Sequence, residues 1–307
     1  MGRGAACGYN PGMPLAFRCI ALIGKRSPEI ADSLGALRAL LRSRGCEVRV
    51  ERETAACVGE HGAAADYDEI GRSCDLAIVL GGDGTMLAAA RNLVRHGVPL
   101  AGINQGRVGF MTDIGWKDMQ TSVDAILEGR HSIEERSLLD AEIRRAGRVL
   151  LRTLALNEAV VGKGAQGRLI EFAVYIDGEY VYTQRSDGVI VATPTGSTAY
   201  ALSAQGPILQ PSVAAFALVP LNPHTLSSRP VSVSDRSTIE IVLVHAVDAR
   251  AHFDGYALAD MAEGDRLVLR RSGDAIRFVH PPGYSYFVML REKLRWSEPV
   301  EKNRERE

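Results

Sequence analysis

A carboxylate lies among three glycines between a predicted strand and a predicted helix. The strand is the strictly apolar run 76–80, and Gly81-Gly82-Asp83-Gly84 follows it directly. Glycines let the backbone turn sharply and approach a ligand, and unpaired N–H groups at the start of a helix attract anions such as phosphate. A carboxylate beside phosphate oxygens is repulsive unless it binds a cation or accepts a hydrogen bond from a hydroxyl. Asp83 is therefore predicted to act as a base toward a phosphoryl-acceptor hydroxyl.

A simpler interpretation of this four-residue motif stays open. A bare Gly-Gly-Asp-Gly can be a tight turn without chemistry, although its position between strand and helix favours the anion site. The sequence has no GxxxxGK[ST] motif, and Leu87 stands where a dinucleotide-binding fingerprint requires glycine or alanine. The motif is therefore neither a P-loop nor an ordinary Rossmann fingerprint.

Two weaker signals follow along the chain. The segment GINQGRVGFMTDI, residues 102–114, places three glycines and Phe110 beyond the next predicted strand, where loops of an open α/β sheet line a crevice. A glycine-rich connector accounts for it equally well. Asn157 and Glu158 end an apolar strand and can recognise an adenine edge or a ribose diol. Taken alone, that pair is more simply interpreted as a capped strand end.

The most specific stretch runs from Gln184 to Leu209. A strand there leads into a hydroxyl-rich turn, Thr193 to Thr198, with helix-capping character, and Tyr200 lies just inside the helix that follows. Hydroxyls and free N–H groups can hold a sugar or phosphate, and a tyrosine ring can lie against a base or nicotinamide. The chemistry alone also permits a plain turn.

The first half of the chain alternates strand and helix patterns. A buried strand is expected at 17–23, followed by a helix that begins at Ser27-Pro28 and ends at Gly45. A strand is expected near 47–50, and residues 57–65, rich in glycine and alanine, are expected to form a loop. Beyond them, the strand 76–80, a helix from about Thr85 to His96 closed by Gly97, and a strand at 99–103 form a βαβ unit. This unit predicts a doubly wound parallel sheet.

The second half changes to short β-type segments separated by turn residues. These segments predict an all-β, sandwich-like domain, and Asp177-Gly178 is typical of a hairpin turn. The strands are expected at 139–144, 149–154, 170–176, 180–184, 189–192, 216–219, 238–244, 266–270 and 275–279. The last periodic segment, 286–296, is expected to be a helix that packs back on the first domain. The predicted domains are therefore 16–130, 131–282 and a returning helical segment, 283–300.

Composition excludes several classes of protein. The 36 basic and 37 acidic side chains leave no positive surplus for a nucleic-acid backbone, so no nucleic-acid partner is expected. Five scattered cysteines without a CxxC spacing indicate neither a disulfide framework nor a zinc knuckle. No run of 18 or more apolar residues is present and the first residues do not form a signal peptide, so a cytoplasmic protein without a membrane partner is expected.

At the GGDG motif the sequence resembles a superfamily of kinases that includes diacylglycerol kinases, sphingosine kinases, 6-phosphofructokinases and NAD kinases. The segments GGDGTML, GINQGRVGFMTD, LNEAVV, SDGVIVATPTGSTAYALSAQGPI and LVPLNPHTLSSRP occur in the order and approximate spacing of NAD kinases, over about residues 17–296. The resemblance implies an N-terminal α/β domain and a C-terminal β-sandwich domain with NAD bound between them. It also implies ATP with Mg2+ as the phosphate donor, and a homo-oligomer, dimer or tetramer, built through the β domains.

The resemblance also assigns roles by position. Asp83 is similar to the proposed base near the ribose 2′-hydroxyl, Gly82 and Gly84 belong to the phosphate-facing loop, and Asn157 and Glu158 resemble the adenosine-recognising pair. The crevice residue Phe110 is counted with the binding residues. The nicotinamide riboside side corresponds to Asp187, Thr198, Ala199, Tyr200, Ala201, Leu202 and Ser203, with Arg168 and Arg185 nearby.

Two positions carry separate hypotheses. Arg185 resembles the NAD-preferring type in the choice between NAD and NADH. Tyr256, in His252-Phe253-Asp254-Gly255-Tyr256, occupies a position where many family members carry glutamine. Its hydroxyl can contact the ligand, or its ring can simply fill space.

Two rival functions stay open. A lipid kinase shares the GGDG motif and a β-rich second domain, but it gives no reason for TPTGSTAY. A regulator that binds NAD without turnover has little use for a carboxylate among phosphates. The scattered histidines lack HExxH or paired ligand spacing, so no protein-ligated metal is expected beyond the Mg2+ that accompanies ATP.

Overall fold

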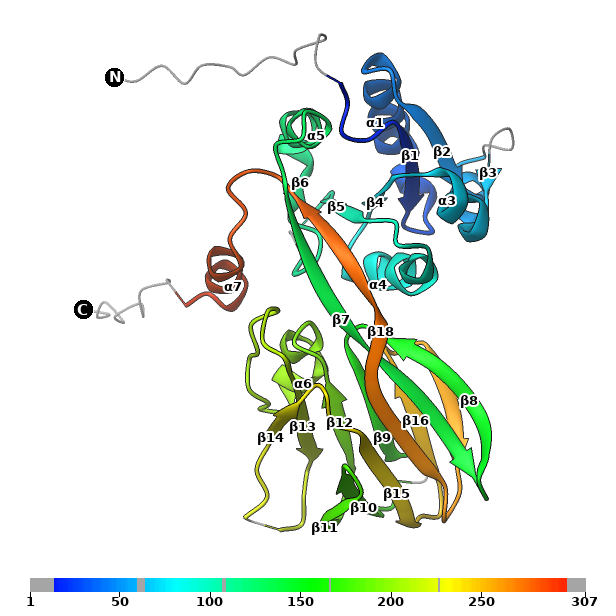
Figure 1. Ribbon diagram of the computed structural model, residues 1–307, viewed down its shortest axis with the longest axis vertical. Coiled ribbons are helices and arrows are strands. Elements are labelled where there is room, and N and C mark those ends of the chain that lie inside the picture. The colour runs from blue at the N-terminus through cyan, green and yellow to red at the C-terminus, as the bar shows by residue number, and fades with distance from the viewer. Residues whose placement is uncertain (1–13, 60–63, 107–108, 166, 226, 297–307) are drawn as a thin grey trace, which may run out of the picture.

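The computed structural model describes residues 14–59, 64–106, 109–165, 167–225 and 227–296. It consists of an α/β part and a β-rich part (Figure 1). No helix in these described ranges is long and apolar enough to cross a lipid bilayer.

The α/β part is built on a parallel sheet with the strand order β5-β4-β1-β2-β3, to which β6 adds beside β5. The order reverses between β4 and β1, which is the doubly wound arrangement that the sequence predicts. Its elements are β1 (Cys19–Gly24), η1 (Pro28–Ile30), α1 (Ala31–Ser43), β2 (Glu47–Glu51), α2 (Arg52–Cys57), β3 (Ala64–Ala65), α3 (Tyr67–Ser73), β4 (Leu76–Leu80), α4 (Asp83–Leu93), η2 (Val94–His96), β5 (Leu100–Asn104), β6 (Ile114–Gly115), η3 (Trp116–Asp118) and α5 (Met119–Leu127).

The start of α1 follows the predicted capping. The Ser27 hydroxyl accepts from the N–H of Glu29, and Pro28 opens a 3-10 turn that leads into the helix. The apolar face of that helix is fully buried. The short helix α2, by contrast, is not predicted by apolar periodicity; the Glu51 side chain starts it by accepting two backbone N–H groups. Residues 60–63 of the predicted loop lie outside the described residues.

The β-rich part contains two sheets packed face to face, which confirms the predicted sandwich-like architecture. One sheet has the order β14-β13-β12-β9-β16-β17; the other contains β11-β10-β15-β18 together with β7 and β8. Phe172, Phe216 and Phe253 meet in the core between them. The elements are β7 (Ser132–Arg145), β8 (Arg148–Ala155), β9 (Glu158–Lys163), β10 (Ile170–Ile176), β11 (Glu179–Ser186), β12 (Gly188–Ala192), η4 (Gly196–Thr198), α6 (Tyr200–Ser203), β13 (Ala215–Leu221), β14 (Val231–Ser234), β15 (Ile239–His245), β16 (Ala249–Phe253), β17 (Ala257–Met261) and β18 (Arg266–His280).

One strand assignment from the sequence is wrong. The pattern predicts two strands at 266–270 and 275–279, whereas the structure has the single strand β18. Its pairing with β7 shifts register between Arg271 and Ala275 and then continues. The Ser-Gly-Asp run at 272–274 resembles a turn, but a similarly long partner strand carries the chain through it.

β7 and β18 connect the two parts. They run as a long antiparallel pair from the β-rich part into the α/β part (Figure 1), where Phe278 of β18 pairs in parallel with Leu100 of β5. One continuous sheet therefore passes through both parts.

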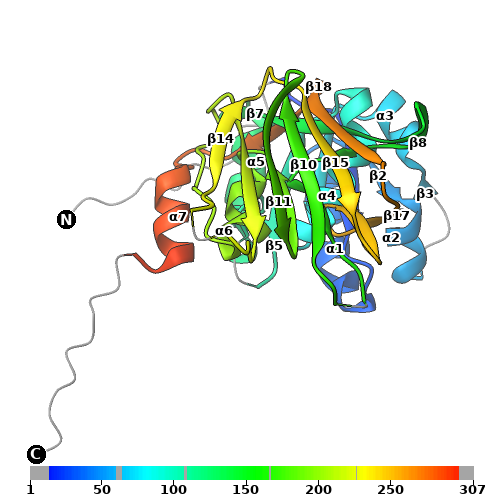
Figure 2. The ribbon, with the colours of Figure 1, turned by 90° about the horizontal axis from the view of Figure 1, so that it is seen from below.

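The C-terminal helix α7 (Tyr286–Leu294) begins at Ser285, whose hydroxyl accepts from the N–H of Val288. It flanks the molecule beside α6 (Figure 2). Together with first-domain residues such as Ile114 and Ser122, α7 borders a cavity of about 320 Å³. This agrees with the predicted helix that returns to the first domain; residues 297–300 of the predicted segment lie outside the described residues.

Candidate active site

The Gly-Gly-Asp-Gly motif forms the junction between β4 and α4. The helix begins at Asp83, earlier than the predicted Thr85, and Gly82 is its extended N-cap residue. The N–H groups of Thr85 and Met86 donate to the carbonyl of Gly82 and close the first turn. The first N–H groups of a helix have no partner within it, and the helix dipole makes this end positive. This geometry supports the predicted anion site.

The Asp83 carboxylate is held in one orientation by the loop that follows β5. Its two oxygens accept the backbone N–H groups of Phe110 (2.9 Å) and Met111 (3.0 Å). The Thr112 hydroxyl lies 3.5 Å from one of these oxygens. Two predicted residues from separate motifs, Asp83 and Phe110, are thus in direct contact.

A cavity of about 140 Å³ lies between the two parts, next to this carboxylate. Its lining comes from both sides, and five predicted site residues converge here: Asp83, Phe110, Asn157, Thr198 and Ala199. Met111, Arg136, Pro194, Thr195 and Tyr286 complete the wall. The lining combines apolar side chains such as Phe110 and Met111 with hydrogen-bonding side chains such as Asn157 and Thr198.

A second cavity, of about 490 Å³, lies on the other side of the Asn157-Glu158 pair. It contains the predicted residues Glu158, Asp187 and Tyr200, together with Lys163 and Asn222. A third hollow of about 510 Å³ shares Tyr200 and Asn222 with the second and also contains Ser203. The second and third cavities therefore adjoin, and Asn157 and Ala199 of the first directly precede Glu158 and Tyr200 in the sequence.

The Glu158 side chain is buried in the wall of the second cavity. Burial, with a smaller contribution from the nearby Asp254, raises the pKa of its carboxyl group to about 7, and the Tyr200 N–H opposes the shift. One of its oxygens has no hydrogen-bond partner among the described residues. A buried carboxyl group with an unpaired oxygen and a raised pKa is a candidate functional group.

Asp187 is half-buried and is held by two partners. Lys163 lies 2.6 Å away, and the Asn222 amide donates a hydrogen bond of 2.8 Å. These contacts, with Lys163 the stronger, lower the pKa of Asp187 below its ordinary value. The carboxylate is therefore charged and fixed at the edge of the second cavity.

Asp254 is a structural determinant of the site that the sequence analysis does not identify. Its buried carboxylate accepts the backbone N–H groups of Leu156 (2.9 Å), Asn157 (2.7 Å) and Glu158 (3.2 Å). The predicted adenosine-recognising pair thus depends on it. The available signal is the Asp254-Gly255 dipeptide, because both residues have positive φ as hairpin-turn residues do.

The hydroxyl-rich turn uses its side chains in two ways. Thr193 and Ser197 bond to backbone groups and fix the turn: the Thr193 hydroxyl accepts the Gly196 N–H, and Ser197 accepts the Leu209 N–H. Thr195 and Thr198 line the cavity with Asp83. The predicted helix capping is wrong, since Ala199 precedes α6 without a side-chain cap.

Tyr256 reaches from the β-rich part to Gly84 in the first turn of α4. Its hydroxyl donates to the carbonyl oxygen of Gly84 at 3.1 Å, and the Arg91 guanidinium lies 4.2 Å from its ring centre. The side chain is 57% exposed, so this contact lies at the surface. Of the two hypotheses, a hydroxyl offered to the ligand and a space-filling ring, this conformation matches neither, because the hydroxyl is bonded to the protein.

The remaining predicted residues lie apart from this group. Arg168 and Arg185 are exposed, on the loop after β9 and on β11, and line none of the three cavities. Ala201 is fully buried in a cluster with Ile190 and Val219, and Leu202 is half-buried. None of these four residues lines any of the three cavities.

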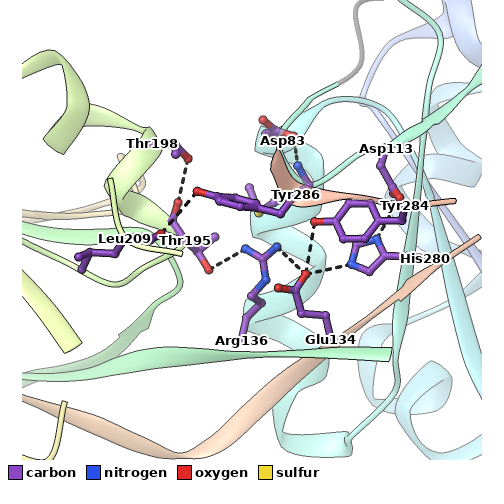
Figure 3. A network of polar contacts seen from close by, with 11 residues as sticks. Asp83, Asp113, Glu134, Arg136, Thr195, Thr198, Leu209, His280, Tyr284 and Tyr286 are labelled. Carbon is purple, nitrogen blue, oxygen red and sulfur yellow. Dashed lines mark hydrogen bonds and ion pairs between the residues drawn. The ribbon is translucent and has the colours of Figure 1, made fainter. Parts of the chain in front are cut away.

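A row of buried charged side chains beside the cavity is a second feature that the sequence analysis does not identify. Glu134 and Arg136 lie on β7 two residues apart, and His280 at the end of β18 lies 3.2 Å from Glu134 (Figure 3). The sequence pattern begins this strand at Leu139. Extending the alternation back places Glu134, Arg136 and Leu138 on one face, which is the signal for an inward-facing charged pair.

Clustered metal ligands are absent from the described part of the chain. Among the residues that the structure describes, no three His, Cys, Asp or Glu side chains are grouped so as to hold a metal ion.

Known proteins share the sequence of this chain over most of its length. The family profile described as "ATP-NAD kinase N-terminal domain" matches residues 37–131, and the one described as "ATP-NAD kinase C-terminal domain" matches residues 156–281. The NAD kinase of Aromatoleum aromaticum is 58% identical over 94% of this chain and 97% of its own. The NAD kinase of an Azoarcus species is 54% identical over 93% and 98%.

Solved structures share the fold. A yeast NADH kinase complexed with NADH superposes with a TM-score of 0.82, at 22% identity, over 94% of this chain and 90% of its own. An NAD kinase from Archaeoglobus fulgidus in complex with ATP gives a TM-score of 0.72, at 26% identity, over 90% and 98%. The identity to the curated relatives across nearly the whole chain, together with both domain profiles, places this chain in the NAD kinase family.

Proposed function

We propose that the enzyme transfers the γ-phosphate of ATP to the 2′-hydroxyl of the adenosine ribose of NAD, and so makes NADP. Relatives more than half identical are named NAD kinases, and the two similar structures hold NADH and ATP. The observation that carries the proposal is the position of Asp83. Its oriented carboxylate starts a helix and faces a cavity between the two parts.

The chemistry follows from this position. Asp83 accepts a hydrogen bond from the ribose hydroxyl and takes its proton as the oxygen attacks the γ-phosphorus in line with the leaving ADP. The N–H groups of Phe110 and Met111 keep the carboxylate from turning away. Free N–H groups at the start of α4 donate to phosphate oxygens. Positioning and fixed dipoles supply most of the rate enhancement.

The predicted binding roles are retained as proposals. Gly82 and Gly84 face the phosphates; the adenosine is held by Asn157, Thr198 and Ala199 in the smaller cavity, against Phe110, with Glu158 beside the ribose. The larger cavities take the nicotinamide riboside side, through the residues Asp187, Tyr200 and Ser203 that line them. The α/β nucleotide-binding domain is proposed to end near residue 130.

The donor is proposed to be ATP with Mg2+. The described residues hold no group of three carboxylate, imidazole or thiolate ligands. A hard cation that keeps several water ligands and binds phosphate oxygens needs no such group. The ion enters with ATP as part of the substrate.

A homo-oligomer in the cytoplasm is also proposed. Exposed apolar side chains lie on strands of the β-rich part, among them Val149 and Leu150 on β8 and Val181 on β11. β8 and β11 are outer strands of the same sheet, so these side chains are available for contact with another subunit. Size-exclusion chromatography with light scattering tests whether the chain is a dimer or tetramer.

The direct test is NADP formation from NAD and MgATP, coupled to an NADP-specific dehydrogenase. NADH and lipid vesicles containing diacylglycerol serve as parallel acceptors. Product from NAD, with less from NADH, supports both the proposal and the preference assigned to Arg185. Lipid phosphorylation without NADP would establish the lipid kinase, and NAD binding without any product would establish a regulator.

A further inference from the structure

Arg136 places a buried positive charge beside the cavity that contains Asp83. Its side chain is only 4% exposed, and it lines this cavity together with Thr195. A buried guanidinium is costly unless it is paired and hydrogen-bonded. Its partners therefore show how its position is fixed.

Arg136 has one carboxylate partner and one hydroxyl partner (Figure 3). One terminal nitrogen donates to Glu134 at 2.9 Å, and the other donates to the Thr195 hydroxyl oxygen at 3.3 Å. Its Nε has no partner among the described residues. The guanidinium thus bridges β7 and the hydroxyl-rich turn and retains an unused donor.

The bond to Thr195 determines what that hydroxyl can do. A guanidinium carries only donors, so the Thr195 oxygen must be the acceptor. Its own hydrogen then points away from Arg136 and can be donated to another group. Because Thr195 lines the cavity, a substrate atom with a lone pair is the partner that this geometry provides for.

Glu134 is itself held by His280 at the end of β18, which also contacts Asp113 of the first domain. His280 lies between two carboxylates, 2.9 Å from Asp113 and 3.2 Å from Glu134, and stacks on the Tyr284 ring at 3.7 Å. Burial lowers the pKa of His280, but the two carboxylates more than offset this, and its pKa is raised above the ordinary value. The His280 ring therefore connects Asp113 with Glu134, which in turn pairs with Arg136.

This network of side-chain contacts begins at the loop that holds Asp83. Asp113 follows Phe110 and Met111, whose N–H groups fix the Asp83 carboxylate. The contacts therefore run from that loop through His280, Glu134 and Arg136 to Thr195, as Figure 3 shows. The network therefore fixes the position of the Thr195 hydroxyl relative to the Asp83 carboxylate.

We propose that Arg136 is a positioning residue of the reaction site, which fixes the Thr195 hydroxyl as a hydrogen-bond donor toward the adenosine moiety of NAD. The inference rests on the proposed function and adds to it a specific pair of residues. Arg136 acts through Thr195, so the two substitutions must not be independent.

The experiment is a double-mutant cycle with Thr195→Val, Arg136→Lys and the double variant, measured as steady-state kcat and KM for NAD at saturating MgATP. Loss of one neutral hydrogen bond corresponds to roughly fivefold to tenfold in affinity. Thr195→Val is expected to raise KM for NAD by about that factor with little change in kcat. Thr195→Ser, which keeps the hydroxyl, is expected to recover most of the loss.

Arg136→Lys keeps a positive charge against Glu134 but cannot hold both partners with one ammonium group. Its KM is expected to rise to the level of Thr195→Val, and the double variant is expected to be no worse than either. Arg144→Lys is the matched control, because Arg144 pairs with Glu142 on the same strand at the same spacing, away from the cavity. Thermal unfolding of each variant identifies any loss of folded protein.

The inference would be overturned if the two substitutions multiplied their effects on KM for NAD in the double variant. An unchanged KM in Thr195→Val would also overturn it. NAD binding is measured in parallel by titration calorimetry. A wild-type enzyme that binds NAD without making NADP contradicts the proposed function alone, and the same cycle in Kd still tests Arg136 and Thr195.

Discussion

A β-carbon at Gly109 would lie 2.0 Å from an oxygen of the Asp83 carboxylate. Only glycine therefore lets the loop approach closely enough for Phe110 and Met111 to donate to that carboxylate. The glycine-rich segment after β5 thus fixes the orientation of the Asp83 carboxylate. A connector with no further role would not require this contact.

The Gly109→Ala variant is expected to displace the Asp83 carboxylate and to lower kcat by roughly tenfold to a hundredfold, because small misplacements of a catalytic group are costly. Steady-state kinetics with NAD and MgATP measure this. Gly106→Ala is the control, since a β-carbon there meets only an ordinary contact at 3.7 Å. Equal rates for both variants would contradict the role assigned to the loop.

Asp254→Asn is expected to lower the free energy of unfolding by about 1–3 kcal/mol, because an amide offers one acceptor oxygen for N–H groups that now bond to two. It should also raise KM for NAD, since Asn157 and Glu158 lose their support. Urea unfolding measures the first effect. The exposed turn residue Asp177 accepts a single N–H, from Thr238, so Asp177→Asn should change little. Equal stability losses in the two variants would count against this account.

The pKa of Glu158, raised to about 7, predicts a pH-dependent stability. Between the ordinary carboxyl pKa near 4.5 and about 7, the folded state binds more protons than the unfolded state, so stability falls as pH rises through this window. The loss approaches about 3 kcal/mol above pH 7. Glu158→Gln cannot titrate, so its stability relative to wild type should increase from pH 5 to pH 8. Parallel unfolding curves for the two proteins across this range would rule out the shift.

Tyr256→Phe removes the hydrogen bond to Gly84 and leaves the ring beside Arg91. We expect KM for ATP to rise roughly threefold to tenfold, since the loop proposed to face the phosphates loses a neutral hydrogen bond. The Kd for NAD should stay within about twofold, because the hydroxyl is bonded to the protein. Tyr180→Phe, another exposed tyrosine whose hydroxyl bonds to Thr183, is the control. Weaker NAD binding with unchanged KM for ATP would instead favour a ligand contact.

Helices, strands and turns were predicted well from the sequence where their formation depends on residues within one segment. The βαβ unit around Asp83 and the Asp177-Gly178 hairpin are examples, because apolar runs and residues that tolerate positive φ act locally. The single long strand β18 was not predictable in this way. Its continuity past Gly273 depends on β7, which is more than 100 residues away.

The residues of the site also divide into those that local motifs identify and those that only long-range packing reveals. Asp83, Asn157 and Thr198 stand in recognisable motifs, and the structure brings them to one cavity. Arg136 and Asp254 lie in segments whose importance depends on what packs against them. Only the fold shows that Asp254 holds three backbone N–H groups, or that Arg136 connects Glu134 to Thr195.

The central claim is that Asp83 is the base in phosphoryl transfer to NAD. Asp83→Asn keeps the size of the side chain and its place at the start of α4 but removes the basic oxygen pair. Turnover and NAD binding should therefore be measured on the same preparation of this variant. The account predicts a folded protein that binds NAD within a few-fold of wild type and loses about a hundredfold or more in kcat. A variant that turns over at the wild-type rate would contradict it.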